Sequence, residues 1–453
     1  MRHTYLLWCV VPLVSGCYLF HGREDSRGAD AGSSGPRADA GTTAGRDAGR
    51  SIFVDGDVLP DDEPDVMPGE RPSDDPSAPE WTDPPPAGSG PCCDVGEVVG
   101  LDDPMRQTSA PRVAWDGSEW GVAWSDMSWP TFAGDPLRAL FRRLDAGGRP
   151  STDPLVIDGI YTGLEAMAYG NHRFALLTSE SAGFRATQLA SLAIVDRDGG
   201  LRARAYLPDG YGGVAIARDE AIHGWAVVAT VPDDNGDSVS QNALLVYDES
   251  LAEVARAEVG WAREGDGHAA IVSLKSLLVV ASGIGSTTIR VFAPRSLEPV
   301  GATDVGALGD QLGGARMRDT VALAGRWYGD SPLRTLVWDP FDERVVAGPT
   351  EVAHATGGGG IALAADEVGG TMGLCYPVGG SEARDADGLM FVLLGPDGTP
   401  LGEPVLVASG FRYVASCAVG AAGPDTYAVL WWASGGEPPA HHSILAARVT
   451  VRR

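Results

Sequence analysis

A short apolar run that leads into an acidic turn recurs about every 50 residues along most of this chain, and this repeat limits the fold more than any other feature. The clearest copies lie at residues 140–145, 192–196, 244–248 and 335–339, with further copies at 289–292 and 391–398. Each copy is followed by a second apolar run, and the two together predict a β-hairpin. The repeat length falls in the range of β-propeller blades.

A further hairpin precedes each of these units. In the best copy, Asp116-Gly117 joins two apolar runs between residues 112 and 124, and Asp-Gly suits the positive φ angles of a tight hairpin turn. The other copies begin near Ala166, Gly213, His268, Ala315, Gly360 and Tyr413. The sequence therefore predicts seven units of two hairpins each.

The ends of this region explain how the units close into a ring. Residues 444–451 are the third strand of the seventh unit, which has no fourth strand of its own. Residues 96–101 form an unassigned strand, and placing it in the last unit closes the ring and covers open sheet edges. We expect an all-β fold over residues 92–453: a β-propeller of seven blades closed by an N-terminal strand. Six or eight blades, or a pair of β-sandwiches, are the alternatives.

The repeats resemble the seven-bladed β-propellers that occur in exported bacterial lipoproteins. This resemblance rests on the repeat pattern over about residues 92–453 and on no named signature. The chain lacks the Trp-Asp and Gly-His pairs of WD40 repeats and the Ser-x-Asp-x-Gly-x-Thr-Trp box of sialidases.

The N-terminus also resembles that of a bacterial lipoprotein. Arg2, an apolar stretch too short to span a bilayer, and the sequence Leu13-Val14-Ser15-Gly16-Cys17 resemble a signal peptide that ends in a lipobox. The resemblance implies that residues 1–16 are removed and that acylated Cys17 anchors the protein to the bilayer of the cell envelope. Tyr18, in place of aspartate, implies transport to the outer membrane. An ordinary signal peptide with a chance cysteine is the alternative.

Residues 17–91 have the composition of a disordered linker. They are rich in Gly, Ala, Asp, Pro and Ser, and they lack the apolar periodicity that offsets the entropy of ordering. Residues 18–91 hold 16 acidic and 6 basic residues, a net charge of −10. We expect an extended tether. Its one apolar island, residues 52–54, is assigned no role, with a docking motif as the alternative.

Charge and motifs narrow the possible ligands. The net charge of −27 argues against nucleic acid as a partner and permits cationic ligands. Residues 233–237 depart from a calcium loop, and His441-His442 lack a third ligand, so we expect neither a metal site nor a cofactor. Catalytic signatures such as Gly-x-Ser-x-Gly and His-Glu-x-x-His are also missing. Their absence leaves an enzyme open, because the active residues of a propeller come from different blades.

Four cysteines remain beyond the signal region: Cys92, Cys93, Cys375 and Cys417. An even number in an exported chain favours two disulfides over a zinc site, with three possible connectivities. Because the closing strand belongs to the seventh blade, we expect Cys92 or Cys93 to pair with Cys417. Cys375 then takes the other partner.

Tryptophans and long connections indicate where a ligand binds. Trp120 and Trp124 alternate along one strand and are expected to pack between neighbouring sheets. The segments between second and third strands are long in most units, and we expect them to share one face. The candidate ligand residues on these segments are Trp129, Phe132, Trp327, Tyr328, Asp233 and Asp237. Aromatic rings beside carboxylates suit a glycan or a cationic peptide.

The sequence thus predicts a membrane-anchored surface or periplasmic lipoprotein whose propeller is a non-catalytic binding or assembly module. A propeller hydrolase or lyase that acts on extracellular polysaccharide is one alternative. A structural component of the envelope is another.

Overall fold

The computed structural model describes residues 52–53, 92–102, 108–126, 138–157, 163–180, 189–231, 239–263, 269–283, 286–327, 331–355, 360–379, 388–411, 413–434 and 442–452. Every element of regular secondary structure in these ranges is a β-strand. None of the described segments forms a helix long and apolar enough to cross a membrane. The predicted signal peptide, Cys17 and the linker apart from Ile52–Phe53 lie outside the described residues.

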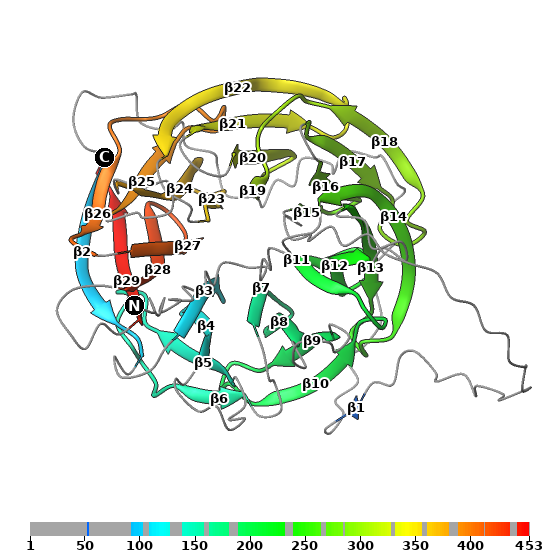
Figure 1. The fold of residues 1–453 in the computed structure, drawn as a ribbon, viewed down its shortest axis with the longest axis horizontal. Helices are drawn as coiled ribbons and strands as arrows, with labels where there is room; N and C mark the ends of the chain where they lie inside the picture. The colour runs from blue at the N-terminus through cyan, green and yellow to red at the C-terminus, as the bar shows by residue number, and fades with distance from the viewer. Residues whose placement is uncertain are drawn as a thin grey trace, which may run out of the picture.

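Seven sheets stand around a common axis like the blades of a propeller (Figure 1). In blades 1 to 6 the four strands follow one another in chain order from the innermost to the outermost position. All neighbouring strands within a blade pair antiparallel, as consecutive hairpins dictate. The predicted all-β fold, the seven blades and the positions of their first strands are confirmed.

The strand bounds follow the chain. Blades 1 to 3 comprise β3 (Thr108–Trp115), β4 (Trp120–Asp126), β5 (Arg138–Leu144), β6 (Leu155–Ile157); β7 (Gly163–Gly170), β8 (Arg173–Glu180), β9 (Leu189–Val195), β10 (Leu201–Tyr206); and β11 (Gly212–Asp219), β12 (Gly224–Val231), β13 (Val239–Tyr247), β14 (Glu253–Arg263). Blades 4 to 6 comprise β15 (Ala270–Leu274), β16 (Leu277–Ser282), β17 (Thr288–Phe292), β18 (Pro299–Asp304); β19 (Gln311–Met317), β20 (Thr320–Arg326), β21 (Ser331–Asp339), β22 (Arg344–Ala355); and β23 (Ala362–Asp366), β24 (Thr371–Val378), β25 (Gly388–Leu394), β26 (Val405–Ser409). Blade 7 comprises β27 (Tyr413–Ala421), β28 (Thr426–Ser434), β29 (His442–Val451) and β2 (Cys93–Gly100).

Blade 7 is completed by a strand from the other end of the domain. β2 pairs antiparallel with β29, with Cys93 opposite Val451 and Gly100 opposite Leu445. Beyond the ladder, the Leu101 N–H donates to the Ile444 carbonyl over 2.9 Å, and the Arg452 N–H donates to the Cys92 carbonyl over 2.9 Å. The predicted N-terminal closing strand is therefore confirmed.

The core lies between blades, because each sheet buries both faces against its neighbours. Trp120 and Trp124 are 1% and 0% exposed and belong to a cluster with Trp432 of blade 7. The predicted packing of these tryptophans between sheets is confirmed. Close approach of blades 1 and 2 also requires Gly121, since a Cβ there would lie 2.3 Å from the Phe174 ring.

The disulfide prediction is wrong in its connectivity. Cys375 of β24 pairs with Cys417 of β27 and joins blades 6 and 7, while Cys92 pairs with its neighbour Cys93. The strand order gives the reason: Cys93 lies on the outermost strand of blade 7 and Cys417 on the innermost, with two strands between them. Three spacings of about 4.8 Å far exceed the Cα separation that a disulfide allows.

The apolar island of the linker forms a strand. β1 (Ile52–Phe53) pairs antiparallel with the outer edge of β10, with Ile52 opposite Arg204 and Phe53 opposite Ala203. It extends blade 2 to five strands. The sequence interpretation that assigned this island no role is wrong, because an outermost strand offers unpaired backbone groups to any extended segment.

We expect deletion of residues 1–90 to leave the melting temperature nearly unchanged and deletion of residues 1–101 to lower it by about 5 °C or more. The longer deletion removes β2 and buried Leu101, and it exposes the edge of β29. Thermal unfolding of both truncated chains beside the full chain measures this. Equal melting temperatures for the two truncations would show that β2 contributes nothing to closure.

Candidate functional site

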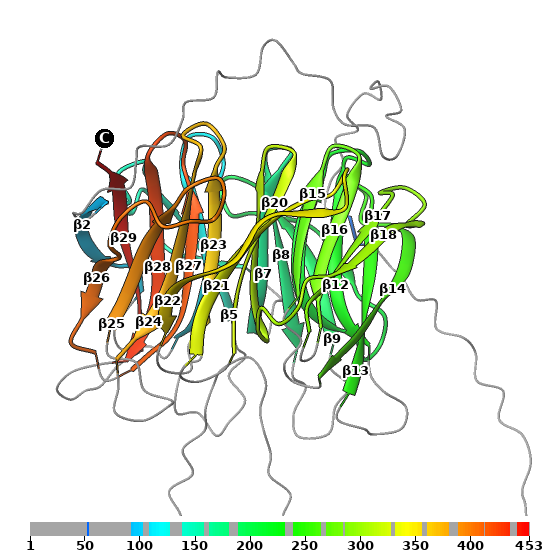
Figure 2. The ribbon, with the colours of Figure 1, turned by 90° about the horizontal axis from the view of Figure 1, so that it is seen from above.

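The propeller has two faces of different construction. The hairpin turns between first and second strands and between third and fourth strands lie on one side, which we name the tight-turn face (Figure 2). The segments between second and third strands and between blades leave from the other side, which we name the connection face. Loops that a rigid scaffold holds on one side are a usual place for binding residues.

The predicted ligand residues belong to the connection face. Trp327 directly follows β20 and is half-buried, and its carbonyl accepts a 2.7 Å hydrogen bond from the Ser331 hydroxyl. This bond spans the segment between the second and third strands of blade 5 and fixes the backbone of Trp327. The other candidates, Trp129, Phe132, Tyr328, Asp233 and Asp237, lie outside the described residues.

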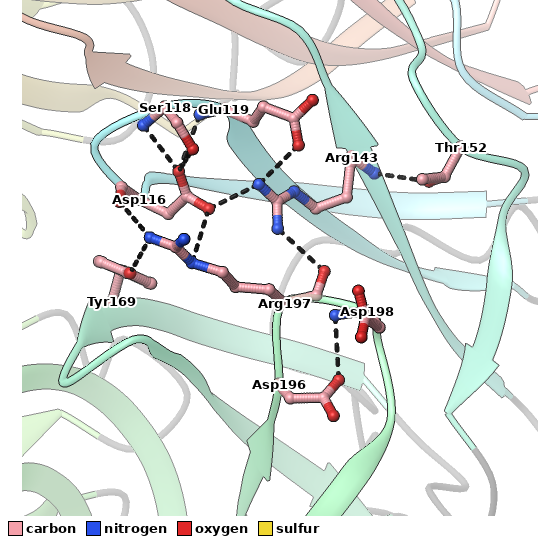
Figure 3. Close-up of polar contacts among 9 residues, drawn as sticks. All are labelled: Asp116, Ser118, Glu119, Arg143, Thr152, Tyr169, Asp196, Arg197 and Asp198. Carbon is pink, nitrogen blue, oxygen red and sulfur yellow. Dashed lines mark hydrogen bonds and ion pairs between the residues drawn. The ribbon is translucent and has the colours of Figure 1, made fainter.

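On the tight-turn face, Asp116 organises a network of charges between blades 1 and 2 (Figure 3). Its side chain is completely buried in the turn after β3, and one carboxylate oxygen accepts 2.8 Å hydrogen bonds from the N–H groups of Ser118 and Glu119. The other oxygen lies 2.5 Å from Nη2 of Arg143. Burial by itself would raise the pKa of Asp116, but these hydrogen bonds and the Arg143 charge lower it overall.

Arg197 extends this network to the second blade. Its Nε lies 3.3 Å from the Asp116 carboxylate, and its Nη2 donates to the Asp116 carbonyl and to the Tyr169 hydroxyl, each over 3.0 Å. Arg143 also donates to the Arg197 carbonyl over 2.9 Å. Since the partners come from turns of both blades, the network fixes blades 1 and 2 against each other on the tight-turn face (Figure 3).

A second set of ion pairs crosses the central channel on the same face. Arg316, near the end of β19, lies 3.2 Å from Glu367 and 3.8 Å from Glu220. These carboxylates follow the innermost strands of blades 6 and 3, so one guanidinium connects three blades at the end of the channel. The tight-turn face is thus joined internally at its centre as well as between blades 1 and 2.

Nearer the connection face, the channel wall carries a charged pair. Glu165 is the third residue of β7, and its backbone carbonyl accepts a 2.6 Å hydrogen bond from Nε of Arg112 on β3. Burial inside the ring raises the pKa of the Glu165 carboxyl, and Arg112 and Ser179 only partly offset this effect. The wall thus holds a desolvated carboxyl group and a guanidinium, groups that can bind an amine or a carboxylate or exchange a proton.

The sequence interpretation missed Arg112 and Glu165. The signal that could have found them is a charged residue in an innermost strand that otherwise consists of apolar and small residues, as in the β7 sequence GLEAMAYG. Within the ranges that the structure describes, no three His, Cys, Asp or Glu side chains come together as a potential metal site.

Comparison with known proteins adds only the general fold. No family model and no curated protein matches the sequence. Among solved structures, parainfluenza virus 5 hemagglutinin-neuraminidase is similar at 8% identity and a TM-score of 0.47, with coverage of 80% of this chain and 95% of that one. A protein of unknown function from Dyadobacter fermentans has 12% identity, a TM-score of 0.43, and coverage of 80% and 100%. Trypanosoma rangeli sialidase has 10% identity, a TM-score of 0.44, and coverage of 76% and 55%.

We expect Asp116→Ala to destabilise the protein by about 3 kcal/mol, because it leaves the buried Arg143 guanidinium without its closest carboxylate. Asp198→Ala is the matched control: Asp198 is exposed on the same face, and its own carboxylate makes no contact with the other residues of Figure 3. Urea unfolding of both variants checks this. A loss below 1 kcal/mol for Asp116→Ala, or equal losses for both, would contradict a role for Asp116 in joining the blades.

Glu165 should make stability depend on pH in a defined direction. A pKa raised by folding favours the protonated form, so this stabilisation is present at low pH and disappears as the pH rises through the folded pKa. Glu165→Gln keeps a neutral side chain at every pH. We therefore expect the variant to gain stability relative to the natural chain between pH 4 and pH 8.

Urea midpoints at both pH values measure this gain, with Glu298→Gln at an exposed position as the control. A difference between the Glu165 variant and the natural chain that stays constant with pH would place Glu165 in a water-like environment.

Proposed function

We propose that this chain is a bacterial cell-envelope lipoprotein, anchored through acylated Cys17, whose propeller binds a ligand at the connection face without converting it. The observation that carries the proposal is the difference between the two faces. The tight-turn face is joined internally by the Asp116 and Arg316 ion pairs, while the segments free to vary in sequence emerge on the other side. A rigid ring with variable connections on one side is the construction of a binding scaffold.

A glycan or a cationic peptide is the ligand class that we propose. Trp327, Trp129 and Tyr328 supply rings for stacking, and Asp233 and Asp237 supply negative charge on neighbouring connections. The net charge of −27 attracts cations to the whole surface. Stacking and charge then hold the ligand without covalent chemistry.

The linker sets the distance of the propeller from the membrane. Pairing of Ile52–Phe53 with β10 leaves residues 18–51, a stretch of 34 residues, between the anchor and blade 2. A flexible chain of that length has an end-to-end distance on the order of 30 Å, and its negative charge extends it further. The propeller then stays close to the membrane surface.

A hydrolase or lyase that acts on extracellular polysaccharide is the second candidate. The specific observation in its favour is Glu165, a channel carboxyl whose pKa burial raises, as a general acid requires. Incubation of the full chain with polysaccharides separates the two candidates. Product formation that Glu165→Gln abolishes would favour the enzyme, and retention without product would favour the binding module.

We expect replacement of Trp129, Trp327 and Tyr328 together by alanine to abolish binding to the glycans or cationic peptides that the natural chain retains on an array. The melting temperature should stay unchanged, because these residues precede or follow strands and contribute little to the core. Asp397→Ala, at an exposed turn of the tight-turn face, is the control. Binding lost in the control and kept in the triple variant would place the working face on the opposite side.

The anchor has its own test. With a labelled fatty acid, Cys17→Ser should lose the label and leave the membrane fraction. Label that persists in this variant would refute lipidation at Cys17.

A further inference from the structure

A groove runs between the outer parts of blades 3 and 4, away from the residues assigned to the connection face. It has a volume of about 490 Å³, which lies in the range of small-molecule sites. Ala257 and Glu258 of β14 line one wall, and residues of β17, β18 and the turn between them line the other. Phe292 and Leu297 are 2% and 3% exposed there, so the lining is firmly packed as well as apolar.

Arg290 places a cation in this groove. It lies on β17, is half-buried, and forms no hydrogen bond or ion pair with any of the described residues. Burial lowers the pKa of its guanidinium, and no carboxylate opposes that effect. A partly desolvated cation without a counter-ion gains free energy when an anion binds beside it.

Third-strand arginines of other blades differ from Arg290 in this respect. Arg142 of β5 donates to the carbonyls of Leu101 and Thr152, each over 2.7 Å. Arg334 of β21 donates to the Ala307 carbonyl over 3.2 Å. In both blades the protein supplies acceptors for the guanidinium, whereas in blade 4 the described residues supply none.

The backbone of β14 makes room for the Arg290 guanidinium. Gly260 has a φ of +126° and lies where the register between β13 and β14 shifts, so that Asn242 faces Gly260 and Ala243 faces Glu258. A Cβ on Gly260 would come within 2.9 Å of Nη2 of Arg290. Any side chain at position 260 would therefore displace the guanidinium, and glycine leaves a cradle for it.

We propose that this groove binds a small organic anion, with one carboxylate or sulfonate group on an apolar body. The anionic group pairs with the Arg290 guanidinium, whose planar donors match two oxygens at once. The apolar body lies against Phe292, Leu297 and Pro299. This site is separate from the proposed ligand face, and neither proposal depends on the other.

The fluorescent probe 8-anilinonaphthalene-1-sulfonate combines a sulfonate with an apolar body and tests the site in the full chain. We expect saturable binding of about one probe per chain, weakened at least about tenfold by Arg290→Gln, because a charge-assisted pair is lost. Arg334→Gln, a third-strand arginine whose partner is a backbone carbonyl, should bind the probe as the natural chain does.

Two further measurements separate this site from general apolar binding. Decanoate should displace the probe, and decanol at the same concentration should not. Val300→Glu adds a negative charge at an exposed position of the groove, 42% exposed in the natural chain, and should weaken binding without changing the melting temperature. Unchanged binding in Arg290→Gln, an equal loss in Arg334→Gln, or equal displacement by decanol would overturn the proposal.

Discussion

The pairing of β2 with β29 is the contact on which the rest of the structure depends. It places residues from the beginning and the end of the domain in one sheet, with Cys93 opposite Val451. A ring of blades without this contact would leave blade 7 with three strands and an open inner edge at β29. Closure lets every blade pack on two neighbours, and it gives each cluster of buried side chains, such as that of Trp120 and Trp432, a wall on both sides.

A closed ring divides the work between its two faces. Short turns bring Asp116, Arg143 and Arg197 within contact distance on the tight-turn face, where the charges hold two blades together. Arg316 does the same across the channel. Since these charges satisfy one another, the face that they occupy offers rigidity, and the variation that binding requires falls to the connections on the other side.

The repeat made the architecture predictable, because each run and its turn specify a hairpin and seven hairpin pairs close only as a ring. The strand of residues 96–101 was recognisable because blade 7 lacked a partner. Contacts between blades were not predictable: the Cys375–Cys417 bond depends on which strand of blade 6 faces β27, and Arg290 and Gly260 meet only through a register shift in β14. Of the predicted ligand residues, only Trp327 lies in the described part of the chain, whereas Arg112 and Glu165 became visible once innermost strands were known.

Hydrogen exchange of the full chain tests closure most directly. If β2 is the outer strand of blade 7, the amides of residues 93–100 that donate to β29 should exchange as slowly as those of β28, since both open only when the ring does. Exchange of these amides at the rate of the preceding linker, while β28 stays protected, would contradict the closed ring.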